Sequence, residues 1–328
     1  MGERLSNTLG VACDADRVAT VLSPDDAQLV VREALEADLP LHILGGASNV
    51  VLLRRLRGIV ALVRSRGITV AERTAHHVRL RVAAGESWHG LVRWCLDHDV
   101  PGLENLALIP GSVGAAPIQN IGAYGVEVSE FIEAVEAVRL ADAEVEMLAP
   151  EACGFAYRDS VFKRNGRHLI VAVHLKFDLS RGLRLDYGDV RARTVEHNPR
   201  SVAEAVMAIR REKLPDPEVV GNAGSFFKNP VVGEHALEGL KSQVPALVHQ
   251  PAADRRYKLS AAQLIDQAGW RGVSRYGVRA WPKQPLVLTN DGATLGRHFL
   301  RMARDIRADI AHRFGVQLER EPVRLGED

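Results

Sequence analysis

The sequence predicts an α+β protein with more than one domain. A chain of 328 residues, 46% of them hydrophobic and 25% charged, is long enough to bury two or three cores. The first part is rich in predicted strands but has no regular alternation of strand and helix, which argues against a Rossmann domain. The stiff segment Pro215-Asp216-Pro217 favours a domain boundary at that point.

Charge and cysteine content exclude several classes of protein. The 42 basic and 41 acidic residues give a net charge of +1, so no strong field favours nucleic acid or an anionic membrane. Three widely separated cysteines argue against a disulfide framework, and no histidine or cysteine spacing indicates a metal site. The sequence shows no apolar signal core and no apolar run near the ~20 residues that span a bilayer. We therefore expect a cytoplasmic protein with no membrane insertion.

Local signals place the elements of the first part. Ser23 and Pro24 predict the start of a helix that runs to about Ala37. Strands are predicted on either side of the glycine turn 45–49, a kind of turn that more often serves hairpins and loops than a phosphate site. The predicted strands are 41–44, 50–53, 59–63 and 78–82, followed by a helix that Ser87 opens and a hairpin formed by 134–140 and 145–148.

The second part carries three helix signals. Ser201 and Glu204 form a capping-box pattern, which predicts the start of a helix that Leu214-Pro215 ends. Arg210 and Lys213 lie on one side of its last turn, either as a solvated helix end or as charge for a ligand. Further predictions are a helix capped by Ser260 with Gln263, a strand over 285–288, and a long amphipathic helix that starts at Leu295 and ends at Gly315.

The segment from Asn105 to Gly125 is the most unusual stretch of the chain. It combines glycines and prolines with almost no charge, so its backbone N–H groups can approach a ligand closely. A purely structural glycine-rich loop is the alternative. The length of the segment and the ordered run from Pro117 to Gly125 favour a cradle for a cofactor.

This cradle resembles the flavin-binding signature of the UDP-N-acetylenolpyruvoylglucosamine reductases, flavoenzymes of bacterial peptidoglycan precursor synthesis. Four later blocks are similar to motifs of that family and occur in the same order. They are Tyr157 to Lys163, Lys213 to Pro217, Gly221 to Pro230 and Leu318 to Glu321. The resemblance covers nearly the whole chain.

The resemblance implies both a fold and an activity. The fold would be α+β, with a two-part FAD-binding domain of the PCMH or vanillyl-alcohol-oxidase type over 1–67 and 68–215. A smaller α+β substrate-binding domain would follow over 216–328, and its last strand would return to the active site. The implied activity is the NADPH-dependent reduction of UDP-N-acetyl-3-O-(1-carboxyvinyl)-glucosamine to UDP-N-acetylmuramate. FAD would be bound non-covalently, NADPH would donate the hydride, and the protein would be a monomer or associate only weakly.

The resemblance also assigns roles to single residues. Arg158 and Glu321 would stabilise an enolate-like state of the substrate, and Ser225 would donate a proton to it. Substrate contacts are implied for Tyr187, on a substrate-covering loop, and for Arg210, Lys213, Asn229 and Gln284. Cofactor contacts are implied for Gly45, Gly46, Ala47, Ser48, Asn49, Pro110, Gly111, Gly114, Ala115, Ala116, Asn120, Gly122, Ala123 and Tyr124.

The chain departs from the family pattern at four places. Ala47 stands where a glycine is usual, Ala115-Ala116 where serines are frequent, and Gln250 where a tyrosine is common. The ending from Glu319 to Arg324 has one residue more than usual, so counting from Leu318 selects Glu321 while Glu319 stays a reserve candidate.

Two other functions remain open from the sequence. A different flavin oxidase or dehydrogenase on the same fold would keep the glycine loops but lack Arg158, Ser225 and Glu321 together. A nucleotide-sugar-binding protein without a redox role would bind the UDP-sugar yet purify colourless.

Overall fold

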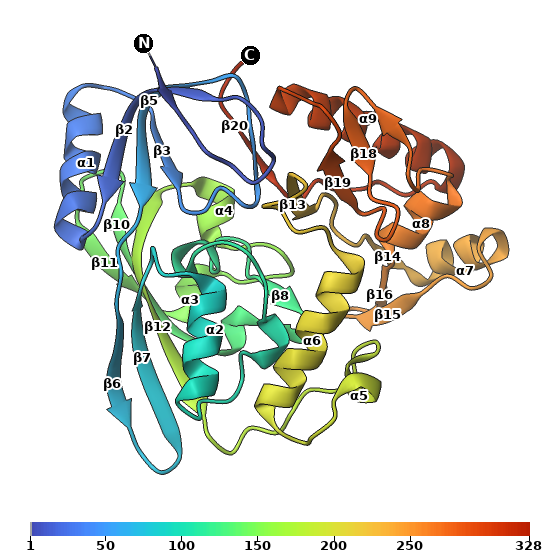
Figure 1. Cartoon of the computed structure of the whole chain (residues 1–328), viewed down its shortest axis with the longest axis horizontal. Coiled ribbons are helices and arrows are strands. Elements are labelled where there is room, and N and C mark those ends of the chain that lie inside the picture. The colour runs from blue at the N-terminus through green and yellow to red at the C-terminus, as the bar shows by residue number, and fades with distance from the viewer. Residues whose placement is uncertain (1) are drawn as a thin grey trace. The chain divides into compact units, whose positions relative to one another are not determined.

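The computed structural model describes residues 2–328, which fold into two compact units. The first unit comprises residues 2–3, 15–47 and 56–212, and the second comprises residues 4–14, 48–55 and 213–328. Each unit has a hydrophobic core of its own. Figure 1 shows the chain coloured from the N-terminus to the C-terminus. The sequence-based boundary at 67/68 falls inside the first unit and stays a prediction.

Two sheets organise the first unit (Figure 1). One has the strand order β1-β2-β5-β3, in which β3 runs parallel to β5. The other is antiparallel, with the order β11-β10-β12-β7-β6. The strands are β1 Glu3–Arg4, β2 Asp14–Val21, β3 Leu41–Leu44, β5 Arg55–Val63, β6 Ile68–Arg73, β7 His77–Ala83, β10 Ile132–Arg139, β11 Val145–Leu148 and β12 His168–Asp178, with a small hairpin of β8 Gly122–Ala123 and β9 Val126–Glu127.

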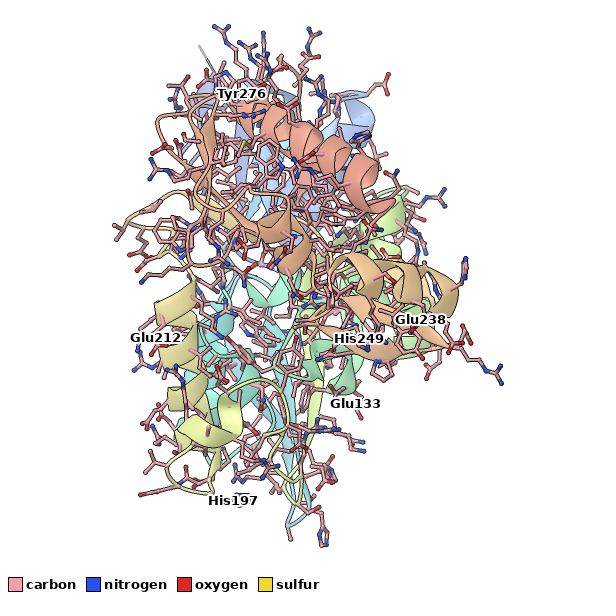
Figure 2. The ribbon with its side chains drawn as sticks, turned by 90° about the vertical axis from the view of Figure 1, so that its right-hand side faces the viewer. Glu133, His197, Glu212, Glu238, His249 and Tyr276 are labelled. Carbon is pink, nitrogen blue, oxygen red and sulfur yellow. The ribbon has the colours of Figure 1, made fainter. Side chains whose placement is uncertain are left out.

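Alternation in β7 gives the antiparallel sheet a buried face and a charged face. Val78, Leu80 and Val82 are at most 1% exposed, as their period of two predicts. The intervening arginines form ion pairs on the other face. Arg79 lies 3.0 Å from the carboxylate of Glu133, which is labelled in Figure 2, and Arg81 forms two 2.9 Å hydrogen bonds with Glu136. Both partners lie on β10, which is separated from β7 by β12 in the same sheet.

The helices of the first unit confirm most of the sequence signals. Ser23 caps α1, and Ser87 caps α2. The capping-box prediction at Ser201 is wrong, because the helix begins two residues earlier at Pro199 and the side chain of Asn198 accepts the Ser201 N–H at 2.8 Å. The Ser201 hydroxyl instead accepts the N–H groups of Val195 and Glu196. The helices are α1 Pro24–Glu36, α2 Trp88–Asp97, α3 Pro150–Cys153, α4 Val161–Asn165, α5 Val190–Arg193 and α6 Pro199–Lys213, with 3₁₀ turns η1 Glu104–Leu106, η2 Val113–Ala115 and η3 Val128–Glu130.

The second unit holds three further sheets and three helices. Their strand orders are β13-β19-β18-β17, β14-β16-β15 and β20-β4, the last pair being parallel. The strand predicted over 285–288 begins two residues later, because Leu286 still lies in the turn that follows β18. The elements are β4 Val50–Leu52, β13 Asn222–Ser225, β14 Val231–Gly233, β15 His249–Ala252, β16 Arg256–Leu259, β17 Ser274–Arg275, β18 Val278–Ala280, β19 Val287–Asn290, β20 Val323–Leu325, α7 Glu234–Gln243, α8 Ala261–Gln267 and α9 Gly296–Phe314.

The long helix α9 is the main support of the second core. Its buried stripe consists of Phe299, Met302, Ile306 and Ile310, at spacings of three and four residues, and Gly315 ends it in the left-handed region, as predicted. Among residues 2–328, none of the helices combines the length and the apolar character that crossing a bilayer requires.

Candidate active site

Two glycine loops of the first unit lie against each other. A Cβ on Gly45 would stand 2.3 Å from Oγ of Ser112, and a Cβ on Gly46 would stand 3.3 Å from Cα of Gly111. The backbone N–H groups of Gly46, Gly111 and Ser112 donate to no other atom of residues 2–328. Unpaired N–H groups on closely approaching backbones are suited to an anion such as a pyrophosphate. This part of the structure therefore fits a dinucleotide cofactor.

Several residues of the cradle hold a strained backbone. Ala47, Leu108, Asn120 and Tyr124 all have φ between 46° and 57°, a region that L-residues seldom adopt. Ala47 thus adopts the left-handed conformation for which a glycine would be suited. The amides of Ala115 and Ala116 are bonded inside the turn η2, to Ser112 and Val113, so neither serves as a spare donor.

Arg158 is held against the carbonyl groups of the cradle. Its guanidinium donates to the carbonyl oxygen of Asn120 at 3.4 Å and, through a short contact, to that of Gly122. Glu127 lies 3.8 Å away, and the Asn120 side chain donates to the same carboxylate at 2.8 Å. Arg158 itself has φ of 54°, so its backbone is strained as well. Together these contacts fix a partly buried cation beside the cradle.

Tyr187, predicted as a loop residue, contacts the cradle. Its ring meets the ring of Tyr124 edge-on, with centroids 6.0 Å apart and an interplanar angle of 84°. Burial raises the pKa of the Tyr124 phenol, whereas the charge of Arg210 favours its ionised form. Burial also lowers the pKa of Arg210, whose Nε is buried and has no hydrogen-bond partner among residues 2–328. Arg210 is thus a partly buried cation close to Tyr124.

In the second unit, Ser225 and Glu321 are close neighbours. Ser225 ends β13, and the next residue, Phe226, accepts the backbone N–H of Glu321 at 3.0 Å. Within the described chain the Ser225 hydroxyl has no hydrogen-bond partner. Glu321 is only 9% exposed.

Glu319 has a different environment from Glu321. Its side chain is 70% exposed and forms a 2.6 Å ion pair with Lys228. The pairing of Phe227 with Arg320 places Glu319 beside Lys228 and Glu321 beside Phe226. Only Glu321 therefore lies at the Ser225 end of this pairing.

Two predicted substrate residues of the second unit retain unused polar atoms. The amide oxygen of Asn229 accepts the first N–H of α8 at 3.0 Å, while its amide nitrogen donates to no residue of the described chain. The amide oxygen of Gln284 is buried without a partner among residues 2–328. The indole N–H of Trp281, in the same turn, is also buried and unpartnered there. Sequence reasoning passed over Trp281, since only a structure reveals an orphaned donor.

The remaining predicted residues are divided between the units. Arg158, Tyr187 and Arg210 belong to the first unit, and Ser225 and Glu321 to the second. The second unit also holds Ser48, Asn49, Lys213, Asn229, Gln284 and Gln250, the last opposite Lys258 on β16. Lys213 is exposed at the end of α6, while Pro110, Gly114 and Ala123 form part of the first unit's cradle. Sequence reasoning also missed Glu127, whose link to Arg158 spans 31 residues of the chain.

Comparison with known proteins places both parts of the chain in described families. Residues 15–148 match a model described as "FAD binding domain". Residues 216–325 match a model described as "UDP-N-acetylenolpyruvoylglucosamine reductase, C-terminal domain". The sequence-based fold class, a two-part FAD-binding fold followed by a second α+β domain, is confirmed.

Relatives match along the full chain. The UDP-N-acetylenolpyruvoylglucosamine reductase of Burkholderia cenocepacia is 44% identical, and the match covers 97% of this chain and 94% of the relative. The enzyme of the same name from Bdellovibrio bacteriovorus is 43% identical, with 97% and 96% covered. The crystal structure of the UDP-N-acetylenolpyruvylglucosamine reductase from Thermus caldophilus is 21% identical and superposes with a TM-score of 0.69 over 99% of both chains, which shows a shared fold.

Proposed function

The chain belongs to the UDP-N-acetylenolpyruvoylglucosamine reductase family, and from this membership we propose how its own residues carry the reaction. It is an FAD-containing oxidoreductase that uses NADPH to reduce UDP-N-acetyl-3-O-(1-carboxyvinyl)-glucosamine to UDP-N-acetylmuramate, in peptidoglycan precursor synthesis. When bound, FAD supplies hydride transfer between NADPH and the enolpyruvyl double bond. The residues of this chain must therefore hold both ligands and manage charge and one proton.

The two glycine loops are assigned to the cofactor. The unpaired N–H groups of Gly46, Gly111 and Ser112 would bind its pyrophosphate, as the close approach of the two loops supports. Asn120 has a different role in this proposal. Its side chain is bonded to Glu127 and to the backbone of Ala156 and Ser129, so it fixes the cradle from inside.

Arg158, Glu321 and Ser225 are assigned to the substrate. Hydride addition to the enolpyruvyl methylene carbon makes it a methyl group and leaves an electron pair on the neighbouring carbon and its carboxylate. The guanidinium of Arg158 stabilises that charge, and Glu321 would do so as a protonated carboxyl group that donates a hydrogen bond to it. The Ser225 hydroxyl then gives its proton to the same carbon, which completes the lactyl ether. The assignment rests on the Ser225 hydroxyl, which has no hydrogen-bond partner in the described chain. The next residue, Phe226, accepts the backbone N–H of the buried Glu321.

Five residues are assigned to holding the substrate. Arg210 and Lys213 would bind the anionic diphosphate and carboxylate of the substrate. Local cations are needed for this because the net charge of the chain is only +1. Asn229 and Gln284 would offer the polar atoms that their present contacts leave unused. Tyr187 would cover the bound substrate from its loop. Tyr187→Ala should therefore weaken substrate retention and leave hydride uptake from NADPH unchanged.

A matched pair of variants tests the assignment of the glutamate. Glu321→Gln keeps the size of the side chain but removes its titratable group, and it should slow reoxidation of the reduced enzyme by substrate about 10²–10⁴-fold. Glu319→Gln removes an exposed partner of Lys228 and should leave that rate near the parent value. Stopped-flow flavin absorbance measures both half-reactions. Slowing by Glu319→Gln alone would overturn the assignment.

We also propose that the protein acts in the cytoplasm, where enzymes of this family act, and that it is a monomer. Light scattering coupled to size-exclusion chromatography should give a mass near 35.9 kDa for the polypeptide. A mass near twice that value would contradict the monomer.

A further inference from the structure

The side chain of Asn105 joins two loops of the first unit that are distant in sequence. Asn105 lies in the turn η1 and is only 1% exposed. Its amide nitrogen donates to the backbone carbonyl of Tyr124 at 3.0 Å and to that of Arg184 at 2.8 Å. Both N–H bonds of one side-chain amide are thus used on main-chain acceptors in two different segments.

The first of these segments is the turn of the cradle hairpin. Tyr124 and Gly125 connect β8 to β9 and have φ of 48° and 82°, so both central residues of the turn are left-handed. A tyrosine tolerates this conformation less readily than glycine does. The hydrogen bond from Asn105 fixes the carbonyl of that strained residue.

The second segment leads into the Tyr187 loop. Arg184 stands three residues before Tyr187, in the irregular stretch between β12 and α5. The Tyr187 ring reaches the Tyr124 ring, and a Cβ placed on Gly125 would lie 3.7 Å from Cβ of Tyr187. The loop is therefore held to the hairpin by the Asn105 amide through the backbone and by the two rings through side chains.

We propose that Asn105 is a positioning residue that holds the Tyr187 loop against the cradle hairpin and thereby sets substrate retention. This inference rests on the proposed role of Tyr187 as a cover for the substrate. The amide oxygen of Asn105 is buried and has no partner among residues 2–328, which is unfavourable on its own. The side chain is thus explained by its two N–H donors, which neither an aliphatic residue nor an ionised aspartate supplies.

Two substitutions remove those donors in different ways. Asn105→Leu keeps the approximate shape and removes all polar atoms, whereas Asn105→Asp turns an anionic oxygen toward two carbonyl groups. Each variant of the FAD-loaded enzyme should raise the KM for the UDP-sugar about tenfold, which corresponds to about 1.4 kcal/mol. Flavin reduction by NADPH should keep its rate. Lowering the pH should recover part of the loss in Asn105→Asp alone, because a protonated carboxyl group donates one hydrogen bond.

Glu104→Gln is the matched control. Glu104 is the neighbouring buried residue in the same turn, and its carboxylate accepts the Gly102 N–H at 2.6 Å. An amide oxygen retains that contact, so KM and flavin binding should stay at the parent values. A similar rise in KM for this control would mean that the turn, and not the Asn105 amide, is responsible, and would overturn the proposal.

Hydrogen exchange and a double variant distinguish the effect of the two Asn105 hydrogen bonds from the covering role of Tyr187. Amides of residues 185–189 should exchange faster in Asn105→Leu, and Asn105→Leu should raise KM little further when Tyr187 is already alanine. Unchanged exchange and unchanged KM would overturn the proposal. Faster exchange, combined with a Tyr187→Ala variant whose KM is normal, would support the holding of the loop by Asn105 and contradict the covering role of Tyr187. Loss of FAD in parallel with the rise in KM would overturn it in favour of a structural role.

Discussion

His89 supports a strained residue of the cradle through one ring nitrogen. The backbone N–H of Leu108, whose φ is 57°, donates to Nδ1 of His89 at 3.1 Å. This contact requires the neutral ring, because a protonated ring turns Nδ1 into a donor. Burial lowers the pKa of His89, and the charges of Arg93, Arg211 and Arg210 lower it further. The surroundings of His89 therefore favour the form of the ring that the cradle needs.

A dependence of stability on pH follows from the depressed pKa of His89. Its contribution is fully present above the unfolded-state value near pH 6.5 and is lost as the pH falls from there through the lower folded-state value. His89→Gln removes this titration. The melting temperature of the parent should fall more than that of His89→Gln between about pH 7 and pH 5, as calorimetry can measure. Parallel curves for the two proteins would contradict the role of His89.

At the scale of elements, η2 packs too closely for any side chain at Gly114. A Cβ there would lie 2.5 Å from Cβ of Ala84 and 3.1 Å from its carbonyl oxygen, and the Gly114 N–H already donates to that oxygen at 2.8 Å. Because this contact seats η2 on the end of β7, the position of the second glycine loop depends on it.

Gly114→Ala should destabilise the protein by about 1–3 kcal/mol through overpacking, and it should weaken FAD retention. Gly182→Ala is the control, because Gly182 is exposed, has no atom within 4 Å of its Cβ position and lacks a positive φ. The control should be neutral or slightly stabilising. Denaturant unfolding and bound flavin per chain measure both effects. Equal stability of the two variants would show that η2 can shift without cost.

How far the sequence predicts these elements depends on the range of the interactions. Caps at Ser23, Ser87 and Ser260 are confirmed because a cap is decided by residues within one turn. The pattern at Ser201 predicts the wrong start of α6, because the helix already begins at Pro199 and the Asn198 side chain accepts the Ser201 N–H.

The candidate site is less predictable than its supporting elements. Family motifs single out Arg158, but its link to Glu127 joins residues 31 positions apart, and Asn105 reaches Arg184 across 79 positions. No local pattern encodes such contacts. The choice between Glu319 and Glu321 likewise depends on backbone pairing, because Glu319 pairs with Lys228 and Glu321 with Phe226. Counting residues along the chain does not reveal this pairing.

At the scale of the whole molecule, the chain contains no exposed thiol. Cys13, Cys95 and Cys153 are at most 1% exposed. Burial, with the neighbouring Asp14 and Glu151, raises the pKa of Cys13 and Cys153 to about 11, and burial raises that of Cys95 further. These thiols therefore stay protonated at neutral pH and make poor nucleophiles.

We expect FAD to be attached non-covalently, because the thiols are buried and neither glycine loop contains a histidine or cysteine. Acid precipitation of the purified protein should release all of the flavin into the supernatant, where its absorbance is measured. Yellow colour that stays with the denatured polypeptide would contradict this prediction.

Stopped-flow spectroscopy of Ser225→Ala shows whether the Ser225 hydroxyl protonates the substrate carbon. This hydroxyl has no other partner within the described chain, so its removal should leave flavin reduction by NADPH nearly unchanged. Reoxidation by the enolpyruvyl substrate should slow by at least about 10²–10⁴-fold, and Ser225→Cys should recover part of the loss. Reoxidation of Ser225→Ala at the parent rate would show that another group delivers the proton, and equal slowing of both half-reactions would show a distorted loop instead.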